Sequence, residues 1–121
     1  MTTQQIADRL VELCRTGQFE EAYTSLFSQD ASSHEAPGVP DGTVVGLDNM
    51  LAKSKAWGED MEAVHEMTVT DPFVYDNFIS VGMYIDVEKK DGTREKGSEI
   101  CLYEVKDGKI ISERFFYQMP G

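Results

Sequence analysis

Two polar residues interrupt strand patterns that are otherwise apolar on one face. Within residues 63–69, His65 shares one strand face with apolar side chains. Within residues 99–105, Glu99 also shares a face with apolar side chains, and Tyr103 is among them. A buried polar group without a partner costs about 1 to 3 kcal/mol, so each must find a partner or line a cavity. A carboxylate and an imidazole facing one cavity would suit proton transfer near neutral pH. The alternative is that His65 is a core histidine bonded to a backbone carbonyl or an acidic neighbour.

The two cysteines do not form a motif for metal or redox chemistry. Cys14 lies in a helical pattern, Cys101 lies in a strand pattern, and the sequence contains no Cys-x-x-Cys pair. Neither cysteine has a histidine nearby in sequence, so a zinc site built on thiolates is not expected. We predict two buried thiols, with a disulfide as the minor alternative.

Length and composition bound the kind of protein that carries these residues. The chain has 121 residues, of which 40% are hydrophobic and 12 are aromatic (one Trp, five Tyr and six Phe), which predicts a single globular domain over residues 1–121. Eleven Lys and Arg against 22 Asp and Glu give a net charge of −11, so neither nucleic acid nor an anionic membrane is expected as a partner. No apolar run approaches the roughly 20 residues of a membrane span, and residues 1–5 lack signal-peptide features, so a cytoplasmic location is expected.

Helical periodicity marks the first part of the chain. Thr2 and Gln5 have capping-box spacing, and apolar residues then recur at helical intervals, which predicts a helix over residues 3–15. A second, short helix is predicted over residues 19–26. The two helices should form a hairpin.

The next stretch carries turn-forming residues before helical spacing returns. Residues 28–46 contain two prolines and several glycines among polar side chains, which predicts a long irregular connection. A third helix is predicted over residues 47–57, with Gly58 just past its end.

From Met61 onward the hydrophobic period changes to two, as is typical of strands. The alternation over 61–69 is interrupted at Pro72, and the apolar parity over 79–87 predicts one buried strand face. Asp-Gly pairs at residues 91–92 and 107–108 predict hairpins that join strands over 93–105 and 109–118. The second half is therefore predicted to be an antiparallel meander.

Three helices followed by long antiparallel strands predict an α+β fold. In this arrangement the sheet curves, and the three N-terminal helices cover its concave face. A curved sheet leaves a pocket at its wide end.

This order of elements, with four sequence segments, resembles the SnoaL-like polyketide cyclase and ketosteroid isomerase families. These families belong to the cone-shaped superfamily related to nuclear transport factor two. The segments are Thr16–Phe19, Leu26–Ala31, Val45–Met50 and Tyr103–Ile110, and the stretch through Tyr117 extends the last of them. The resemblance covers nearly the whole chain and implies a cone-shaped antiparallel sheet with the three helices on its concave side.

The resemblance also implies positions for catalytic groups. The isomerase general base falls on Glu35, next to His34, and a slip of one residue would exchange which of the two faces inward. The helix tyrosine that donates to an oxyanion in the isomerases corresponds to Leu10 here, which argues against steroid-isomerase chemistry. The second acidic donor falls near Ile100, with Glu99 as the nearest carboxylate. Candidate catalytic residues are thus Glu35, His34, His65 and Glu99.

Several large side chains are expected to line the pocket and contact a bound molecule. The candidate substrate-binding residues are Tyr23, Trp57, Met83, Tyr103, Phe115 and Tyr117. The alternative for each is a purely structural place in the core. The candidate catalytic histidines and glutamates could also mimic a metal set, but the short spacings of histidine ligands are missing, so neither a metal nor a cofactor is expected.

Aromatic residues with outward parity point to a partner. Phe78, Tyr84 and Phe116 should lie on the sheet face turned away from the helices, where a second copy of the chain is the simplest cover. A homodimer through the sheet is also what the resemblance implies.

The leading hypothesis is a protein that binds a small, largely apolar carbonyl compound, with carboxylate or histidine proton transfer of the isomerase, cyclase or lyase type. The competing hypothesis is a ligand-binding or dimerisation module without catalysis.

Overall fold

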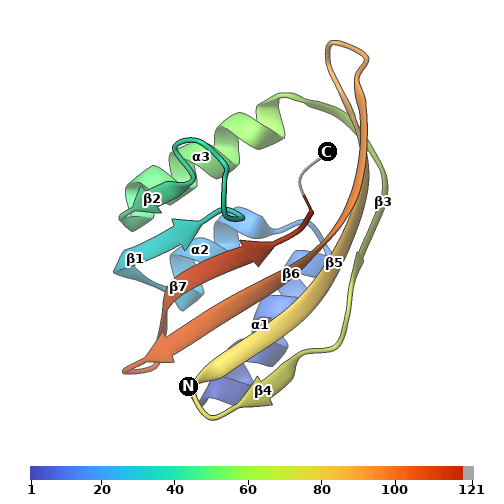
Figure 1. Ribbon diagram of the computed structural model, residues 1–121. Coiled ribbons are helices and arrows are strands. Elements are labelled where there is room, and N and C mark those ends of the chain that lie inside the picture. Colours follow the sequence, from blue (N-terminus) through green and yellow to red (C-terminus); the bar gives the residue numbers. More distant parts are fainter. Residues whose placement is uncertain (119–121) are drawn as a thin grey trace.

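The computed structural model describes residues 1–118 and shows three helices packed on one face of a curved sheet (Figure 1). The helices are α1 (Thr3–Arg15), α2 (Phe19–Leu26) and α3 (Leu47–Glu59). The strands are β1 (Phe27–His34), β2 (Thr43–Val45), β3 (Met61–Val69), β4 (Phe73–Tyr75), β5 (Phe78–Lys89), β6 (Arg94–Lys106) and β7 (Lys109–Phe116). The predicted α+β class and the helical cover of the concave face are confirmed.

The sheet is mixed, whereas the sequence predicted a purely antiparallel one. Its strand order is β2-β1-β7-β6-β5-β3, with the short β4 paired to β5. All neighbouring strands are antiparallel except β1 and β7, which are parallel. Because β1 and β7 come from opposite ends of the chain, their parallel pairing joins the N-terminal half to the meander.

Strand β1 lies in the stretch that the sequence predicted to be an irregular connection. Phe27, Ala31 and Ser33 are buried, but small and polar residues dominate the strand and hide its alternation. The irregular part is limited to residues 35–42, after which β2 returns antiparallel to β1. Helix α3 also continues through Gly58 to Glu59, two residues further than predicted.

Local sequence explains the helix ends and the hairpins. The Thr2 hydroxyl accepts a hydrogen bond from the Gln5 amide at 3.1 Å, and the Gln5 side chain accepts one from the Thr2 amide, so the predicted capping box forms. Asp107 and Gly108 both have positive φ, 53° and 76°, which a two-residue turn between right-twisted strands requires. The β6–β7 hairpin that they make sets which residues of β7 face inward.

The core lies between α1, α2 and the lower half of the sheet. Its fully buried side chains include Ile6, Leu13, Leu26, Ile79 and Ile110. Helix α1 contacts β3, β4 and β5, whereas α3 crosses β1 and β2 at the other side of the sheet. Towards α3 and the long β5–β6 hairpin the layers separate, and the space between them is the candidate site. In residues 1–118 no helix is both long and apolar enough to cross a membrane.

Candidate active site

A cavity of about 1040 Å³ lies between the concave face of the sheet and the three helices. Helix α1 contributes Leu10 and Cys14 to its wall, and α3 contributes Met50, Lys53 and Trp57. The exposed residues 95–98 of β6 also line it, so the cavity opens between the β5–β6 hairpin and the end of α3. This is the wide end of the curved sheet, where the pocket was expected.

Every candidate substrate-binding residue lies on the wall of this cavity. They are Tyr23, Trp57, Met83, Tyr103, Phe115 and Tyr117. Together with Phe19, Phe27 and Met67 they make the wall largely apolar. Trp57 is 40% exposed and stands at the mouth, whereas Tyr103 is buried. The wall suits a flat or compact organic molecule; which residues contact one is still a prediction.

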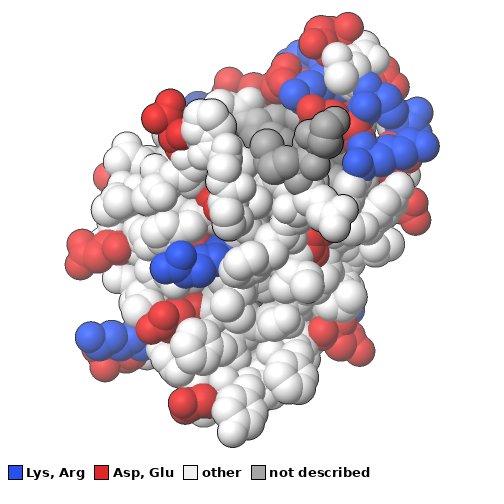
Figure 2. Space-filling model, viewed as in Figure 1, with Lys and Arg blue, Asp and Glu red and all other residues white. Residues whose placement is uncertain are grey.

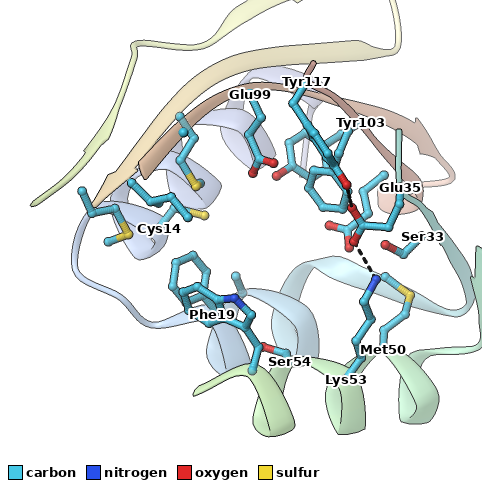
Figure 3. A pocket seen from close by; sticks show the side chains of 18 of the residues that line it. Cys14, Phe19, Ser33, Glu35, Met50, Lys53, Ser54, Glu99, Tyr103 and Tyr117 are labelled. Carbon is cyan, nitrogen blue, oxygen red and sulfur yellow. Dashed lines mark hydrogen bonds and ion pairs between the residues drawn. The ribbon is translucent and has the colours of Figure 1, made fainter. Parts of the chain in front are cut away.

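Besides Glu95 at the exposed rim, three glutamates line the cavity and come from different elements. Glu35 follows β1, Glu99 lies on β6, and Glu113 lies on β7. Figure 3 shows the Glu99 and Glu35 side chains directed into the cavity from the sheet side. The three differ in their partners, and therefore in what each can do.

Glu35 is held in place by two side chains. Its Oε1 accepts from Lys53 Nζ at 2.6 Å, and its Oε2 accepts from the Tyr117 hydroxyl at 2.8 Å (Figure 3). The Glu35 amide donates to the Gly42 carbonyl at 2.8 Å, and a Cβ at Gly42 would lie 3.1 Å from the Glu35 Cβ. The loop 35–42 therefore closes tightly and fixes an ion pair that spans the cavity from the sheet to α3.

Glu99 projects from the middle of β6, directly opposite Met83 of β5. Its nearest polar neighbour is the thiol of Cys101, whose Sγ lies 3.6 Å from Glu99 Oε1. Among the described residues Glu99 has no ion-pair partner, and burial raises its pKa, with the charge of Glu35 adding to the rise. Burial therefore makes Glu99 a better proton acceptor than an exposed carboxylate.

Glu113 is the most deeply buried of the three carboxyls, with 3% of its surface exposed. The Tyr23 hydroxyl donates a hydrogen bond to its Oε1 at 2.8 Å. Burial raises the pKa of Glu113 to about 7, although the hydroxyls of Tyr23 and Ser33 and the charge of Lys53 act in the opposite direction. Near neutral pH, Glu113 is therefore poised between its charged and neutral forms.

The structure places His34 outside the cavity. Its ring lies between the hydroxyls of Ser32 and Thr43, at 2.9 and 3.4 Å. Desolvation, together with the charge of Arg114, lowers its pKa. Of the two neighbouring candidates, Glu35 is the one that faces inward, and His34 belongs to the opposite face of β1.

The expectation that His65 shares a site with Glu99 is wrong. His65 Nε2 lies 3.2 Å from Glu88 Oε1, on the face of the sheet away from the cavity, and the side chain is exposed. The register of β3 against β5 shifts between Val64 and Glu66, so a β-bulge at His65 reverses the alternation. The competing interpretation, a histidine bonded to an acidic neighbour, fits, although His65 is at the surface and not in the core.

Two important residues of the cavity, Glu113 and Lys53, were not predicted from the sequence. Glu113 has the same parity on its strand as Phe115 and Tyr117, so the alternation that marked those two residues would also have marked Glu113. Lys53 sits one turn after Met50 on α3, a spacing that puts both on one helix face. The pairing of Lys53 with Glu35 carries no local sequence signal.

Thiol and metal chemistry gain no support within residues 1–118. Both cysteines are free and buried, as predicted. Burial raises the pKa of Cys14 to about 12, so it stays a thiol rather than a nucleophilic thiolate. No group of three or more His, Cys, Asp or Glu in these residues is arranged to hold a metal ion. The carboxyls are therefore the groups of the cavity best suited to transfer protons.

Comparison with known families and structures agrees with the fold. The model of a SnoaL-like domain matches residues 1–117. A crystal structure from Mesorhizobium loti, described as a SnoaL-like polyketide cyclase and also labelled a carbohydrate phosphatase, is 35% identical. The match covers 97% of this chain and all of that one, with a TM-score of 0.89.

More distant structures share the fold at lower identity. Bal32a, from a soil-derived mobile gene cassette, is 19% identical with a TM-score of 0.78, over 95% of this chain and 88% of that one. A protein of ketosteroid isomerase-like fold from Catenulispora acidiphila, solved in complex with trimethylamine, is 20% identical with a TM-score of 0.73, over 98% and 88% of the two chains. No curated protein matches the sequence at a significant level.

Proposed function

Because the chain belongs to the SnoaL-like domain family, we propose that it binds a small, largely apolar carbonyl compound and transfers a proton next to the carbonyl without a cofactor. The observation that carries this proposal is the cavity itself, in which Glu35 and Glu99 face one largely apolar volume. Isomerases, cyclases and lyases that act on such compounds all require this proton transfer. The proposal therefore covers these three reaction types without choosing one of them.

The two carboxyls take different roles in the proposal. Glu99 is the proton-transfer group, because it is desolvated and has no ion-pair partner among the described residues. Lys53 and Tyr117 fix Glu35 in place, and the charge of Glu35 raises the pKa of Glu99. His34 and His65, which lie outside the cavity, have no part in the step.

The alternative is a binding module of the same fold without catalysis. The ion pair between Glu35 and Lys53 favours it, because a carboxylate that is already paired is not free to act as a base. In either case we propose a homodimer formed through the outer face of the sheet. We also propose a cytoplasmic location, since two free thiols suit a reducing compartment.

Exchange of carbon-bound hydrogen separates the two functions. The protein is incubated in D₂O with neutral ketones of the right size, 2-acetylnaphthalene and 2-tetralone, and loss of the α-proton signals is followed by NMR. We expect faster exchange than in buffer, and about 100-fold slower exchange in Glu99→Gln, the lower end of the usual effect of a general base. Exchange at the rate of buffer alone would leave the binding module as the function. Rates above buffer that are equal in both proteins would show that Glu99 is not the proton-transfer group.

A further inference from the structure

The thiol of Cys101 contacts the carboxyl that the proposed function uses for proton transfer. Cys101 follows Glu99 by two residues on β6, so the two side chains point to the same face of the sheet. The Cys101 thiol donates a hydrogen bond to Glu99 Oε1, with 3.6 Å between sulfur and oxygen. Among the described residues, no other group donates a hydrogen bond to the Glu99 carboxyl. The orientation of this carboxyl therefore depends on one thiol.

Cys101 belongs to the core, whereas Glu99 lines the cavity. None of the Cys101 surface is exposed, and the register places the residue between Val81 of β5 and Phe115 of β7. Cys101 is not one of the described residues on the cavity wall. Close packing therefore fixes the position of the sulfur, and the thiol acts on a ligand only through Glu99.

The thiol keeps its proton at every pH at which the protein would work. Burial raises the pKa of Cys101, and the charges of Glu99 and Glu113 add to the rise. A neutral thiol has one proton to donate, and Glu99 Oε1 receives it. Because Oε1 is held as an acceptor, a proton that Glu99 takes up belongs on Oε2.

A thiol orients the carboxyl at a small cost in basicity. A hydrogen bond to a carboxylate favours the charged form and lowers its pKa, and a thiol is a weaker donor than a hydroxyl. At Glu99, burial is the largest influence and raises the pKa, while the bond from Cys101 acts in the opposite direction. A serine at position 101 would lower the proton affinity of Glu99 further.

The other titratable groups around Glu99 come from three different elements. Glu35, which follows β1, raises the pKa of Glu99 through its charge, and Tyr117, which follows β7, feels the charge of Glu99. Lys53 of α3 is paired with Glu35 at 2.6 Å. Met83, opposite Glu99 on β5, does not titrate. These groups are the same in variants of Cys101, so a change in the titration of Glu99 reports the thiol.

Building on the proposed function, we propose that Cys101 is a positioning residue, whose thiol holds Oε1 of Glu99 and so directs Oε2 to the proton of the ligand. In the step that it supports, the C–H bond next to the ligand carbonyl breaks and the proton moves to Oε2. The electron pair of that bond stays on the ligand as its enolate. The proton then returns from Oε2 to a carbon of the ligand.

The titration of Glu99 tests the hydrogen bond without any need for catalysis. Carboxyl ¹³C chemical shifts are followed against pH in the unmodified protein, Cys101→Val and Cys101→Ser, and Glu99→Gln identifies the signal. We expect the midpoint of Glu99 to rise by about 0.4 pH unit in Cys101→Val, the lower end of the value of a hydrogen bond, and to fall in Cys101→Ser. Cys14→Val removes the other buried thiol, whose pKa responds to Glu113, and should leave the midpoint of Glu99 unchanged.

The exchange of the α-protons of 2-tetralone in D₂O tests the positioning role. Above all three midpoints, we expect Cys101→Val to exchange the ketone about tenfold more slowly than the unmodified protein, since its carboxyl is no longer fixed. This loss would occur although Glu99 is the stronger base in that variant. Cys101→Ser keeps a donor at the same place and should lose less activity.

Either of two results overturns the assignment. A Glu99 midpoint that is the same in Cys101→Val, Cys101→Ser and the unmodified protein would show that the thiol does not bind the carboxyl. Exchange in Cys101→Val as fast as in the unmodified protein would show that the thiol does not position it. Midpoints that move as expected in a protein that exchanges 2-tetralone no faster than buffer would instead contradict the proposed catalysis and uphold the bond between Cys101 and Glu99.

Discussion

Glu113 makes the stability of the protein depend on pH in an unusual direction. Its pKa is raised from 4.5 to about 7 by burial, so the folded state binds a proton that the unfolded state has already released between these values. The contribution of Glu113 to the free energy of unfolding is fully present below pH 4.5 and is lost as the pH rises to 7. The loss over this window is about 3 kcal/mol, and Glu113→Gln should remove it.

Urea unfolding at pH 5 and pH 7.5 measures this effect as the difference between the unmodified protein and Glu113→Gln. The comparison is needed because His34, whose pKa is lowered, acts with the opposite sign around pH 6, and Glu99, whose pKa is raised, acts with the same sign as Glu113. Both contributions cancel in the difference. A pH profile that is the same in both proteins would show that Glu113 is ionised throughout.

Lys53 interacts with two glutamates from one position on α3. It pairs with Glu35 and also lowers the pKa of Glu113 through its charge. We expect Lys53→Met to raise the pKa of Glu113 above 7, because the Glu35 charge is then no longer offset. Carboxyl ¹³C chemical shifts across a pH titration measure this directly. Lys55→Met, which changes an exposed lysine of the same helix, is the control and should leave the titration of Glu113 where it is.

At the scale of elements, α3 is attached to the fold by fewer buried side chains than α1. Leu47 and Met50 are its only buried residues, whereas α1 buries six. We expect Leu47→Ala to lower the free energy of unfolding by about 2 to 4 kcal/mol. Backbone amides of α3 should exchange with solvent faster in this variant than those of α1, as hydrogen exchange read by mass spectrometry would show. Leu51→Ala, at a partly buried position, should have a smaller effect; equal loss of protection in α1 and α3 would contradict independent attachment.

Sequence patterns predicted the elements whose alternation is uninterrupted. The apolar parity of β5 and the helical spacing of α1 are strong local signals, and both elements formed as predicted. Strand β1 was not predicted, because its inward side chains include the small Ala31 and Ser33, which carry little hydrophobic contrast. Its parallel partner β7 lies about 80 residues away, so no local pattern could indicate the pairing.

The candidate site was predictable to the same extent. The parity of β6 correctly turned Glu99 towards the cavity, since that part of the strand is regular. The alternation along β3 predicted the wrong face for His65, because a β-bulge adds one residue to the strand and leaves no signal in the sequence. The ion pair of Glu35 with Lys53 depends on how α3 crosses the sheet, which is a property of the packed molecule.

At the scale of the whole molecule, charge is distributed unevenly. Figure 2 shows acidic and basic side chains gathered at the tip of the β5–β6 hairpin, where Lys89, Lys90 and Arg94 lie among acidic residues. The outer face of the sheet shows few charges in the same view. A net charge of −11 therefore does not keep every surface polar, and the weakly charged face is where a second molecule can approach.

An apolar patch on the outer face carries the prediction of a homodimer. Its residues are Phe73, Tyr75, Phe78, Ile100 and Phe116, each exposed by 41% or more. The register puts Tyr75 opposite Phe78 and Ile100 opposite Phe116, so these residues share the face away from the cavity. Contiguous apolar surface of this kind is rare on monomers.

We expect sedimentation equilibrium at micromolar concentration to give twice the chain mass of 13.6 kDa. Ile100→Glu should shift the protein to the monomer, because a charge at the centre of an apolar interface is desolvated without a partner. Glu62→Gln removes a charge at an exposed position near the start of β3, and this change should leave the dimer intact. The inward-facing cavity is left untouched by both changes, so ketone binding should be retained in the Ile100→Glu monomer. A protein that sediments as a monomer without any substitution would remove the dimer from the proposal and leave the outer patch unexplained.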